Sequence, residues 1–545
     1  MVLTNSDPLV ASTASGAVRG QLLNGVRSWR GIPYGAPPTG PLRFRAPQPP
    51  APWDGVRDAL HFGNAAPQHE NKAVALPAGV TQSEDCLYLN VTAPATDGPG
   101  TGTGTGTGTG DLKPVMVWIH GGAYVAGSNA QPLFDGTHLV ANGDVVFVAL
   151  NYRLGALGFL DFSSFSTPEL TFETNLGLRD ILAGLTWVQQ NIAAFGGDPG
   201  DVTLFGESAG GGCVTTLLTS PAAAGLFHRA LAESAPATSV YGPERAARVA
   251  ARVLEVAGAP PDAGGAEGRR DDEEGPRAVT PAELLTLPAE VLSQAAFELV
   301  AAVSADAPGT LAIGPVVDGD VVPVHPIEAY QAGSQLPLPL IIGTNRDEAS
   351  LFRLMKSPLM PITQTSVHAM FEQIALERPE LDVAALEPRI EGAYPHFPHH
   401  RTPSEVSRDA GFRMPSIWLA AAHSRVAPTR MYRFDHSTPA LRLLGIGATH
   451  GAEIAYVFGN FEITKKDFSF RLGGRDAAHR LSAVIQHRWL AFARGHDAVG
   501  PGGEPWPLYD DATRSTLVFD HGETVVDDPD AAIRTAWGDT VVSFE

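Results

Sequence analysis

The segment 202–211 (VTLFGESAGG) constrains the fold of this chain more than any other stretch. Residues 202–205 form a short apolar run typical of a buried strand, and small residues suited to a helix follow the serine. Gly206 and Gly210 allow a tight turn and close packing of the helix on the strand. The segment therefore predicts a strand, a sharp turn and a helix, with the Ser208 hydroxyl at the turn and at the positive end of the helix. The alternative is a glycine-serine turn without chemistry.

Apolar runs and helical patterns alternate along the chain. We expect strands at 87–92, 115–119, 145–150, 202–205, 339–343 and 429–434, a Pro-rich strand region at 311–325, and an antiparallel hairpin from 16–20 and 26–32. We expect helices at 178–195 and 478–494 and through most of 350–425. This order predicts an α/β fold, in which a mainly parallel sheet carries helices on both faces.

The chain has 545 residues, of which 44% are hydrophobic, so it can bury a large core. Length alone suggests several domains, but large α/β enzymes can form one. We expect a single domain over 1–545. Two segments without a regular pattern, the Gly/Thr repeat within 97–111 and the charged stretch 257–279, are expected to be flexible inserts within it.

Charge and composition exclude several classes of partner. The net charge of −21 repels nucleic acids and anionic membranes. Neither a signal peptide nor an apolar run of the roughly 18 residues that a membrane span requires is apparent, so we expect a cytoplasmic protein. Cys86 and Cys213 are the only cysteines, and a buried thiol is the default interpretation for Cys213. The sequence does not indicate an oligomeric state.

A serine becomes a nucleophile when an imidazole accepts its proton and a carboxylate orients that imidazole. Two loops after Ser208 offer these groups. The loop 343–348 follows an apolar run and ends in the adjacent carboxylates Asp347 and Glu348, between which spacing does not decide. His450 lies in a later loop of small residues. The order serine, acid, histidine is that of the α/β-hydrolases.

The intermediate of acyl transfer needs N–H donors for its negatively charged oxygen. Gly121 and Gly122 follow the predicted strand 115–119 and offer bare backbone N–H groups, and Ala209 offers the N–H next to the nucleophile. A glycine turn at a strand end is the alternative. His120 has no ligand-spaced histidine near it in sequence, so we expect neither a metal nor a cofactor.

Two long motifs carry a resemblance to a known family, residues 195–210 (FGGDPGDVTLFGESAG) and 84–91 (EDCLYLNV). Shorter matches are 31–34 (GIPY), 42–44 (LRF), 120–122 (HGG), 151–153 (NYR), 175–178 (NLGL), 315–319 (PVVDG) and 506–509 (WPLY). With these motifs the chain resembles the type-B carboxylesterase/lipase family, which includes cholinesterases and bacterial para-nitrobenzyl esterases. The resemblance runs from about residue 16 to about residue 520 and implies an α/β-hydrolase fold with large helical insertions.

The resemblance also implies roles for single residues. It makes Ser208 the nucleophile, Glu348 rather than Asp347 the acid, and His450 the base. It places Ser234 as a support of the acid, although the family usually has Gln-Ser-Gly where this chain has Glu-Ser-Ala. The oxyanion donors that it implies are the N–H groups of Gly121, Gly122 and Ala209.

The chain departs from the family at two places. Cys86 matches half of a disulfide of secreted members, but 62–68 has alanine at the partner's position, so we expect a free thiol. The loop 67–83 is short and lacks the tryptophan that binds quaternary ammonium in cholinesterases, so choline esters are not favoured. The resemblance further implies two structural ion pairs, Arg43 with Glu84 and Arg153 with Asp180.

These observations predict a serine carboxylesterase that hydrolyses small to medium, uncharged carboxylic esters through an acyl-enzyme. Acyl transfer to another acceptor and hydrolysis of amides, carbamates or lactones are alternatives on the same site. A binding module is less favoured, because Ser208, Glu348 and His450 are all present. Five apolar residues either contact substrate or belong to the core: Phe352, Leu354, Met355, Met360 and Phe371.

Overall fold

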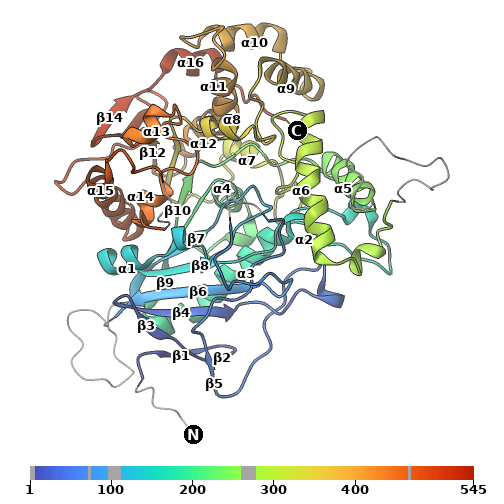
Figure 1. The fold of residues 1–545 in the computed structure, drawn as a ribbon, viewed down its shortest axis with the longest axis vertical. Coiled ribbons are helices and arrows are strands. Elements are labelled where there is room, and N and C mark those ends of the chain that lie inside the picture. Colours follow the sequence, from blue (N-terminus) through green and yellow to red (C-terminus); the bar gives the residue numbers. More distant parts are fainter. Residues whose placement is uncertain (1–6, 71–74, 96–111, 259–277, 464–467, 545) are drawn as a thin grey trace.

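A computed structural model of the protein describes residues 7–70, 75–95, 112–258, 278–463 and 468–544. The predicted insert 97–111 and nearly all of 257–279 lie outside the described residues. Figure 1 shows one twisted sheet crossing the molecule, with helices packed around it. That the chain 1–545 forms a single domain stays a proposal.

The sheet has eleven strands in the order β14-β13-β12-β11-β10-β9-β7-β8-β6-β4-β3. Their bounds are β3 Gln21–Leu23, β4 Val26–Pro33, β6 Tyr88–Pro94, β7 Lys113–Ile119, β8 Val146–Leu150, β9 Gly197–Glu207, β10 Arg229–Glu233, β11 Leu340–Asn345, β12 Thr429–Phe434, β13 Ser515–Phe519 and β14 Glu523–Asp527. Every pairing from β8 to β13 is parallel, and the pairings at both edges are antiparallel. The predicted mainly parallel sheet is confirmed.

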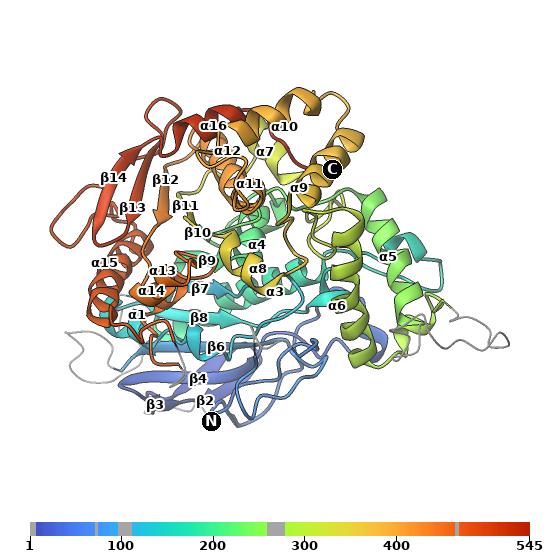
Figure 2. The ribbon, with the colours of Figure 1, turned by 45° about the horizontal axis from the view of Figure 1, so that its top comes forward.

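Both faces of the sheet are covered because side chains alternate between them along each strand. In β7, Val117 and Ile119 join one core, and Met116 and Trp118 join the other. Helices α3 (Leu176–Asn191), α4 (Ala209–Leu217) and α12 (Met414–His423) supply the first core, and α1 (Thr137–Gly143), α14 (Ile454–Phe458) and α15 (Arg475–Ala493) supply the second. Figure 2 shows α14 and α15 on one side of the sheet. This two-sided packing is the predicted α/β-hydrolase arrangement.

A helical region follows β11, as predicted for 350–425. It comprises α8 (Ala349–Met355), α9 (Gln364–Glu377), α10 (Val383–Gly392), α11 (Thr402–Arg408) and α12, and a π-helical turn at Asp409–Arg413 joins the last two. The C-terminal helix α16 (Ala531–Trp537) packs against α10. Arg413 and Arg433 both pair with Asp530 just before α16, at 3.6 and 2.9 Å. The last part of the chain is thereby fixed to the helical region.

Two expectations about the strands are wrong. The segments 16–20 and 26–32 do not pair with each other, because β2 (Gly16–Arg19) pairs with β1 (Val10–Thr13) and β5 (Val56–Asp58) in a separate three-stranded sheet. The hairpin is instead β3 to β4, around an Asn24-Gly25 turn whose φ angles are both positive, as such two-residue turns require. The region 311–325 forms only the single bridge Val316 to Tyr241, because its prolines and glycines cannot sustain a strand.

The predicted ion pairs are confirmed. Arg153 binds the buried Asp180 through two guanidinium nitrogens at 2.7 and 2.8 Å, and Arg43 Nε lies 2.7 Å from Glu84. Both cysteines are buried free thiols, as predicted, and burial raises the pKa of each. Neither thiol is therefore a candidate nucleophile.

Candidate active site

The turn between β9 and α4 presents Ser208 with φ 57° and ψ −124°, a conformation that non-glycine residues rarely adopt. Two glycines make this turn possible. A Cβ on Gly206 would lie 2.7 Å from the carbonyl oxygen of Ile119, and one on Gly210 would lie 2.1 Å from the same oxygen. The strand, turn and helix predicted from the sequence are confirmed.

Three side chains far apart in sequence form one line of contacts. Ser208 Oγ lies 2.8 Å from His450 Nε2, and His450 Nδ1 lies 2.7 Å from Glu348 Oε2. Glu348 follows β11, and His450 lies in the loop between α13 (Pro439–Leu443) and α14. A histidine with its proton on Nδ1 donates to the carboxylate and leaves Nε2 free to accept the serine proton.

The neighbouring carboxylate, Asp347, has a different role in the geometry. Its side chain accepts a hydrogen bond from the backbone N–H of Ala448 at 3.0 Å and pairs with Arg346 at 3.2 Å. It thus fixes the loop that carries His450 without touching the imidazole. The structure thereby distinguishes the two carboxylates that spacing left equivalent.

Two hydrogen bonds hold the Glu348 carboxylate in place. Ser234 Oγ donates to Glu348 Oε1 at 2.6 Å, and the backbone N–H of Asn345 donates to the same oxygen at 2.7 Å. Ser234 Oγ also lies 3.1 Å from a second buried carboxylate, Glu453. The contact that the resemblance implied for Ser234 is therefore present.

A further buried carboxylate reaches the imidazole from the other side. Glu207 Oε1 lies 3.3 Å from His450 Nε2, and only 5% of Glu207 is exposed. Burial raises the pKa of Glu207, and the nearby carboxylates Glu453 and Glu348 add to this increase while His450 opposes it. Burial alone would lower the pKa of His450, but Glu207 and Glu348 outweigh it and raise that pKa.

Sequence reasoning did not single out Glu207 or Glu453. Their positions offered a signal, since Glu207 directly precedes Ser208 and Glu453 lies three residues after His450. Acidic residues are mostly exposed, so the sequence alone does not indicate that these two are buried. The fold shows that both side chains are buried near the histidine.

Backbone N–H groups from two loops surround the serine. A Cβ on Gly121 would lie 2.8 Å from the Glu207 carbonyl oxygen and 3.0 Å from Ser208 Cβ, so this loop approaches the turn closely. Within the described part of the chain, the N–H groups of Gly121, Gly122 and Ala209 have no hydrogen-bond partner. They remain available to a substrate oxygen.

His120 precedes these glycines and is fully buried. Its ring stacks on Tyr152 with 4.5 Å between centroids, and its Nδ1 lies 2.9 Å from the Gly121 carbonyl oxygen. Burial lowers the pKa of His120 to about 4, although the backbone contact opposes this, so the ring is neutral. A neutral, packed imidazole fixes the glycine loop.

A cavity of about 830 Å³, including its opening to solvent, lies above Ser208 and His450. Its wall is mostly apolar. The larger apolar side chains that line it are Leu311, Phe352, Leu359, Met360, Met370, Ile374, Phe412, Val542 and Phe544. Among the described lining residues, His450 and Tyr241 are the only ionisable ones.

Of the five apolar residues that we expected either at the substrate or in the core, Phe352 and Met360 line the cavity. The Phe352 ring lies 5.3 Å from the His450 ring. Leu354 and Met355 belong to neither group, because they are 62% and 54% exposed; residue 354 points away from residue 352 on α8. Phe371 is fully buried and packs in the core.

Other walls of the cavity were not predicted. Phe412, in the π-helical turn, places its ring 4.6 Å from His450. Tyr241 comes from the segment after β10, and the residues Val542 and Phe544 come from the C-terminal segment. No local pattern marks such residues, because they meet only through the fold.

Comparison with known proteins identifies the family. The sequence matches the carboxylesterase family over residues 7–535. The chain belongs to this family. This carboxylesterase is 38% identical to the para-nitrobenzyl esterase of Bacillus subtilis, over 96% of this chain and 97% of that protein. It is 34% identical to the cocaine esterase of Oryctolagus cuniculus, over 92% and 90% of the two chains.

Comparison with solved structures identifies the same family. A structure named thermophilic PNB esterase superimposes on this carboxylesterase with a TM-score of 0.81 and 35% identity, covering 97% of this chain and all of the other. The predicted family, α/β-hydrolase fold and serine carboxylesterase activity are therefore confirmed. Among the described residues, every helix is too short or too polar to span a bilayer.

Proposed function

We propose that this carboxylesterase forms its acyl-enzyme on Ser208, with His450 as general base and acid and Glu348 as the orienting carboxylate. The observation that carries the proposal is the unbroken contact from Ser208 Oγ through His450 to Glu348, at 2.8 and 2.7 Å, at the bottom of an apolar cavity. A nucleophile within hydrogen-bond reach of an oriented base is the arrangement that acyl transfer needs.

The reaction then proceeds in two halves. His450 Nε2 accepts the Ser208 proton while Oγ attacks the ester carbonyl, and the same proton passes to the leaving alcohol. Water, activated by His450, then attacks the acyl-enzyme and releases the acid. In both halves the N–H groups of Gly121, Gly122 and Ala209 stabilise the oxyanion, and each donor lowers the barrier by about 3 kcal/mol.

Ser234 acts in this proposal as a positioning residue. Its hydroxyl and the Asn345 N–H bind the same oxygen of Glu348, so the other oxygen points at His450. Because the carboxylate is fully buried, a lost partner is not replaced by bulk water. The geometry of the base is therefore set by residues that do not touch the substrate.

We further propose that the substrates are small to medium, uncharged esters. The apolar wall of the cavity favours uncharged groups, and the relative from Bacillus subtilis is named for para-nitrobenzyl esters. We expect kcat/KM for para-nitrobenzyl butyrate to exceed that for butyrylcholine at least about tenfold, because burying an unpaired ammonium is costly. Equal values would contradict this assignment.

Labelling with a fluorophosphonate, followed by mass spectrometry, tests the proposed nucleophile. We expect one adduct, on Ser208, because only an activated serine reacts with this probe. An adduct on another residue, or no adduct on folded protein, would refute the assignment.

Gly121→Ala is expected to lower kcat by about 10²–10³ with little change in KM, because a Cβ there displaces one oxyanion donor. Steady-state kinetics with para-nitrophenyl butyrate measures the effect. The control is Gly392→Ala, since a Cβ on Gly392 meets no atom within 4 Å. Equal kinetics for the two variants would place the oxyanion donors elsewhere.

Glu207→Gln is expected to shift the pH profile of kcat/KM. When it is ionised, Glu207 stabilises the imidazolium of His450 and so raises its pKa, and the base is active only above that pKa. Removing the charge lowers the pKa, and the rising limb of the profile moves to lower pH by about one unit. Exposed Glu169 serves as control, and Glu169→Gln should leave the limb in place. A limb that stays, or moves to higher pH, in Glu207→Gln excludes this coupling.

The sequence expectations of a cytoplasmic location, and of no binding to nucleic acid or membrane, stay predictions. So do the alternatives of acyl transfer and of amide or carbamate hydrolysis. Product analysis with and without an added alcohol separates hydrolysis from acyl transfer.

A further inference from the structure

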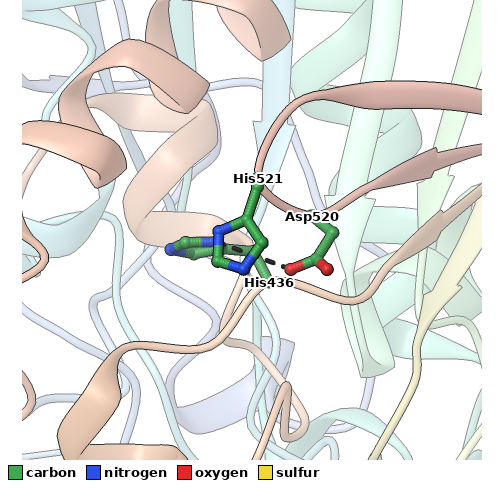
Figure 3. Close-up of side chains that lie close together, drawn as sticks. All are labelled: His436, Asp520 and His521. Carbon is green, nitrogen blue, oxygen red and sulfur yellow. Dashed lines mark ion pairs between the residues drawn. The ribbon is translucent and has the colours of Figure 1, made fainter.

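Three potential metal ligands meet at the carboxyl ends of two neighbouring strands. His436 lies just after β12, and Asp520 and His521 directly follow β13. Each offers one ligand atom, and these atoms all lie within 4.8 Å of one another. Figure 3 shows the His436 and His521 rings and the Asp520 carboxylate converging on one point. The two strands are parallel, so their ends meet at the same edge of the sheet.

His436 is an unusual member of this group because it is buried. Only 4% of its side chain is exposed, yet among the described residues neither ring nitrogen has a hydrogen-bond partner of good geometry. The ring contacts the Asp520 backbone, and the carboxylate oxygen Asp520 Oδ1 lies 3.9 Å from Nδ1, too far for a hydrogen bond. Buried polar groups are rarely left unpaired, so an imidazole in this position calls for a partner.

The backbone holds the three residues together independently of any ligand. The N–H groups of His436 and of the preceding Asp435 both donate to the Phe519 carbonyl oxygen, at 3.0 and 2.8 Å. The N–H of Asp520 donates to the Gly522 carbonyl oxygen at 2.9 Å and closes the turn to β14. The site is therefore organised on two strand ends that cannot move apart freely.

We propose that His436, Asp520 and His521 bind a divalent transition-metal ion of the Zn²⁺ type. Two imidazole nitrogens and one carboxylate oxygen form a donor set that Zn²⁺ accepts, whereas Mg²⁺ and Ca²⁺ prefer oxygen donors. Tetrahedral ligands about 2.1 Å from the ion lie roughly 3.4 Å apart, so the side chains must close slightly. The exposed His521 and the half-buried Asp520 have room to do so. A water molecule would complete the tetrahedral coordination.

The ion would have a structural and not a catalytic role, since within the described part of the chain none of its three ligands lines the cavity above Ser208. The His436 ring instead packs edge-on against Tyr456 of α14, with 5.5 Å between centroids. Because α14 begins shortly after His450, the ion would join β12, β13 and the support of the catalytic loop. Metal binding at this site does not depend on the proposed esterase mechanism.

The test is equilibrium dialysis of chelator-treated protein against Zn²⁺ at neutral pH. We expect one Zn²⁺ per chain and a rise in the midpoint of thermal unfolding. Co²⁺ in its place should give the intense visible absorption of a four-coordinate site. His521→Ala should weaken Zn²⁺ binding at least about a hundredfold, because even changing a ligand's hydrogen-bond partner costs about 10–100-fold. His521 is exposed, so this variant is expected to fold.

The matched control is the double variant His399→Ala/His400→Ala. These two exposed histidines lie outside the proposed site, with their ring centroids 4.0 Å apart, and could bind a metal nonspecifically. We expect the control to keep the wild-type affinity. Zn²⁺ binding that survives His521→Ala, or that is lost in the control, would overturn the proposal, as would saturation by Mg²⁺ or Ca²⁺ at the same site.

Discussion

Ser208→Ala is expected to lower kcat/KM for para-nitrophenyl butyrate by about a millionfold. The substitution removes the oxygen that lies 2.8 Å from His450 Nε2 and with it the covalent intermediate. Removing a nucleophile from such a unit costs about as much as removing the whole unit, because base and acid have no other partner to activate. Residual turnover would come from the oxyanion donors and from binding alone.

The measurement compares this variant with Ser239→Ala. Ser239 lines the same cavity, so the control removes a hydroxyl from the same surroundings. We expect the control to stay within a few-fold of wild type, and circular dichroism should show both variants folded. A Ser208→Ala enzyme that keeps more than about one thousandth of wild-type kcat/KM would show that another group is the nucleophile.

Glu348→Gln is the second substitution with a large expected effect, about ten-thousandfold in kcat/KM. The amide keeps the shape of the side chain, but it presents a neutral group to His450 Nδ1, now 2.7 Å from a carboxylate. The imidazole then loses both its preferred tautomer and the charge that stabilises its protonated form. KM should change little, because Glu348 is buried away from the cavity.

Asp347→Asn provides the matched control for this experiment. The two carboxylates are adjacent in sequence, yet Asp347 binds the Ala448 N–H and only shapes the loop before His450. We expect a loss of about tenfold or less. If Asp347→Asn were the more damaging of the two, the assignment of the acid would have to be reversed.

Local patterns predicted most of what holds the nucleophile. A Cβ on Gly206 or Gly210 would collide with the backbone of the neighbouring strand. Only glycine fits such positions, so the two glycines indicate the tight turn in the sequence itself. The apolar runs that became β7, β8 and β11 are short and buried on both faces, and such runs have few alternatives to a central strand. The order of these strands in the sheet follows from tertiary packing, which no single run encodes.

Patterns were less informative where a residue's environment comes from distant segments. Glu207 and Glu453 look like ordinary acidic residues until the fold buries them around His450. The direction of residues 354 and 355 depends on how α8 is rotated, which its short sequence does not specify. The expected hairpin of 16–20 with 26–32 is wrong because the two-residue turn Asn24-Gly25 pairs β4 with the strand directly before that turn, β3.

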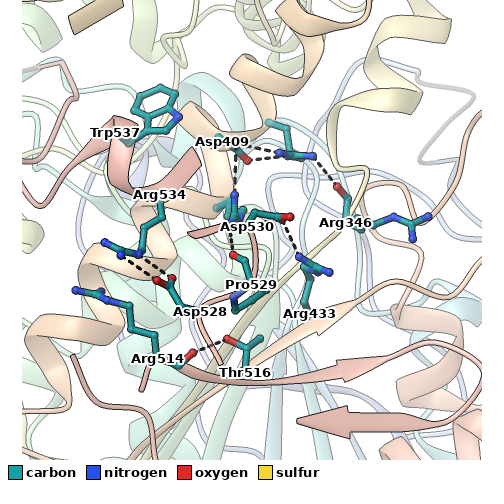
Figure 4. A network of polar contacts seen from close by, with 12 residues as sticks. Arg346, Asp409, Arg433, Arg514, Thr516, Asp528, Pro529, Asp530, Arg534 and Trp537 are labelled. Atoms are coloured by element: carbon teal, nitrogen blue, oxygen red, sulfur yellow. Dashed lines mark hydrogen bonds and ion pairs between the residues drawn. The ribbon is translucent and has the colours of Figure 1, made fainter. Parts of the chain in front are cut away.

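The segment after α16 contributes Val542, Ser543 and Phe544 to the wall above Ser208. Figure 4 shows how the chain is anchored just before α16, with Asp530 facing Arg433 and Asp528 facing Arg534. During synthesis, a ribosome-bound chain can therefore contain every residue of the proposed triad and still lack one wall of the cavity above Ser208.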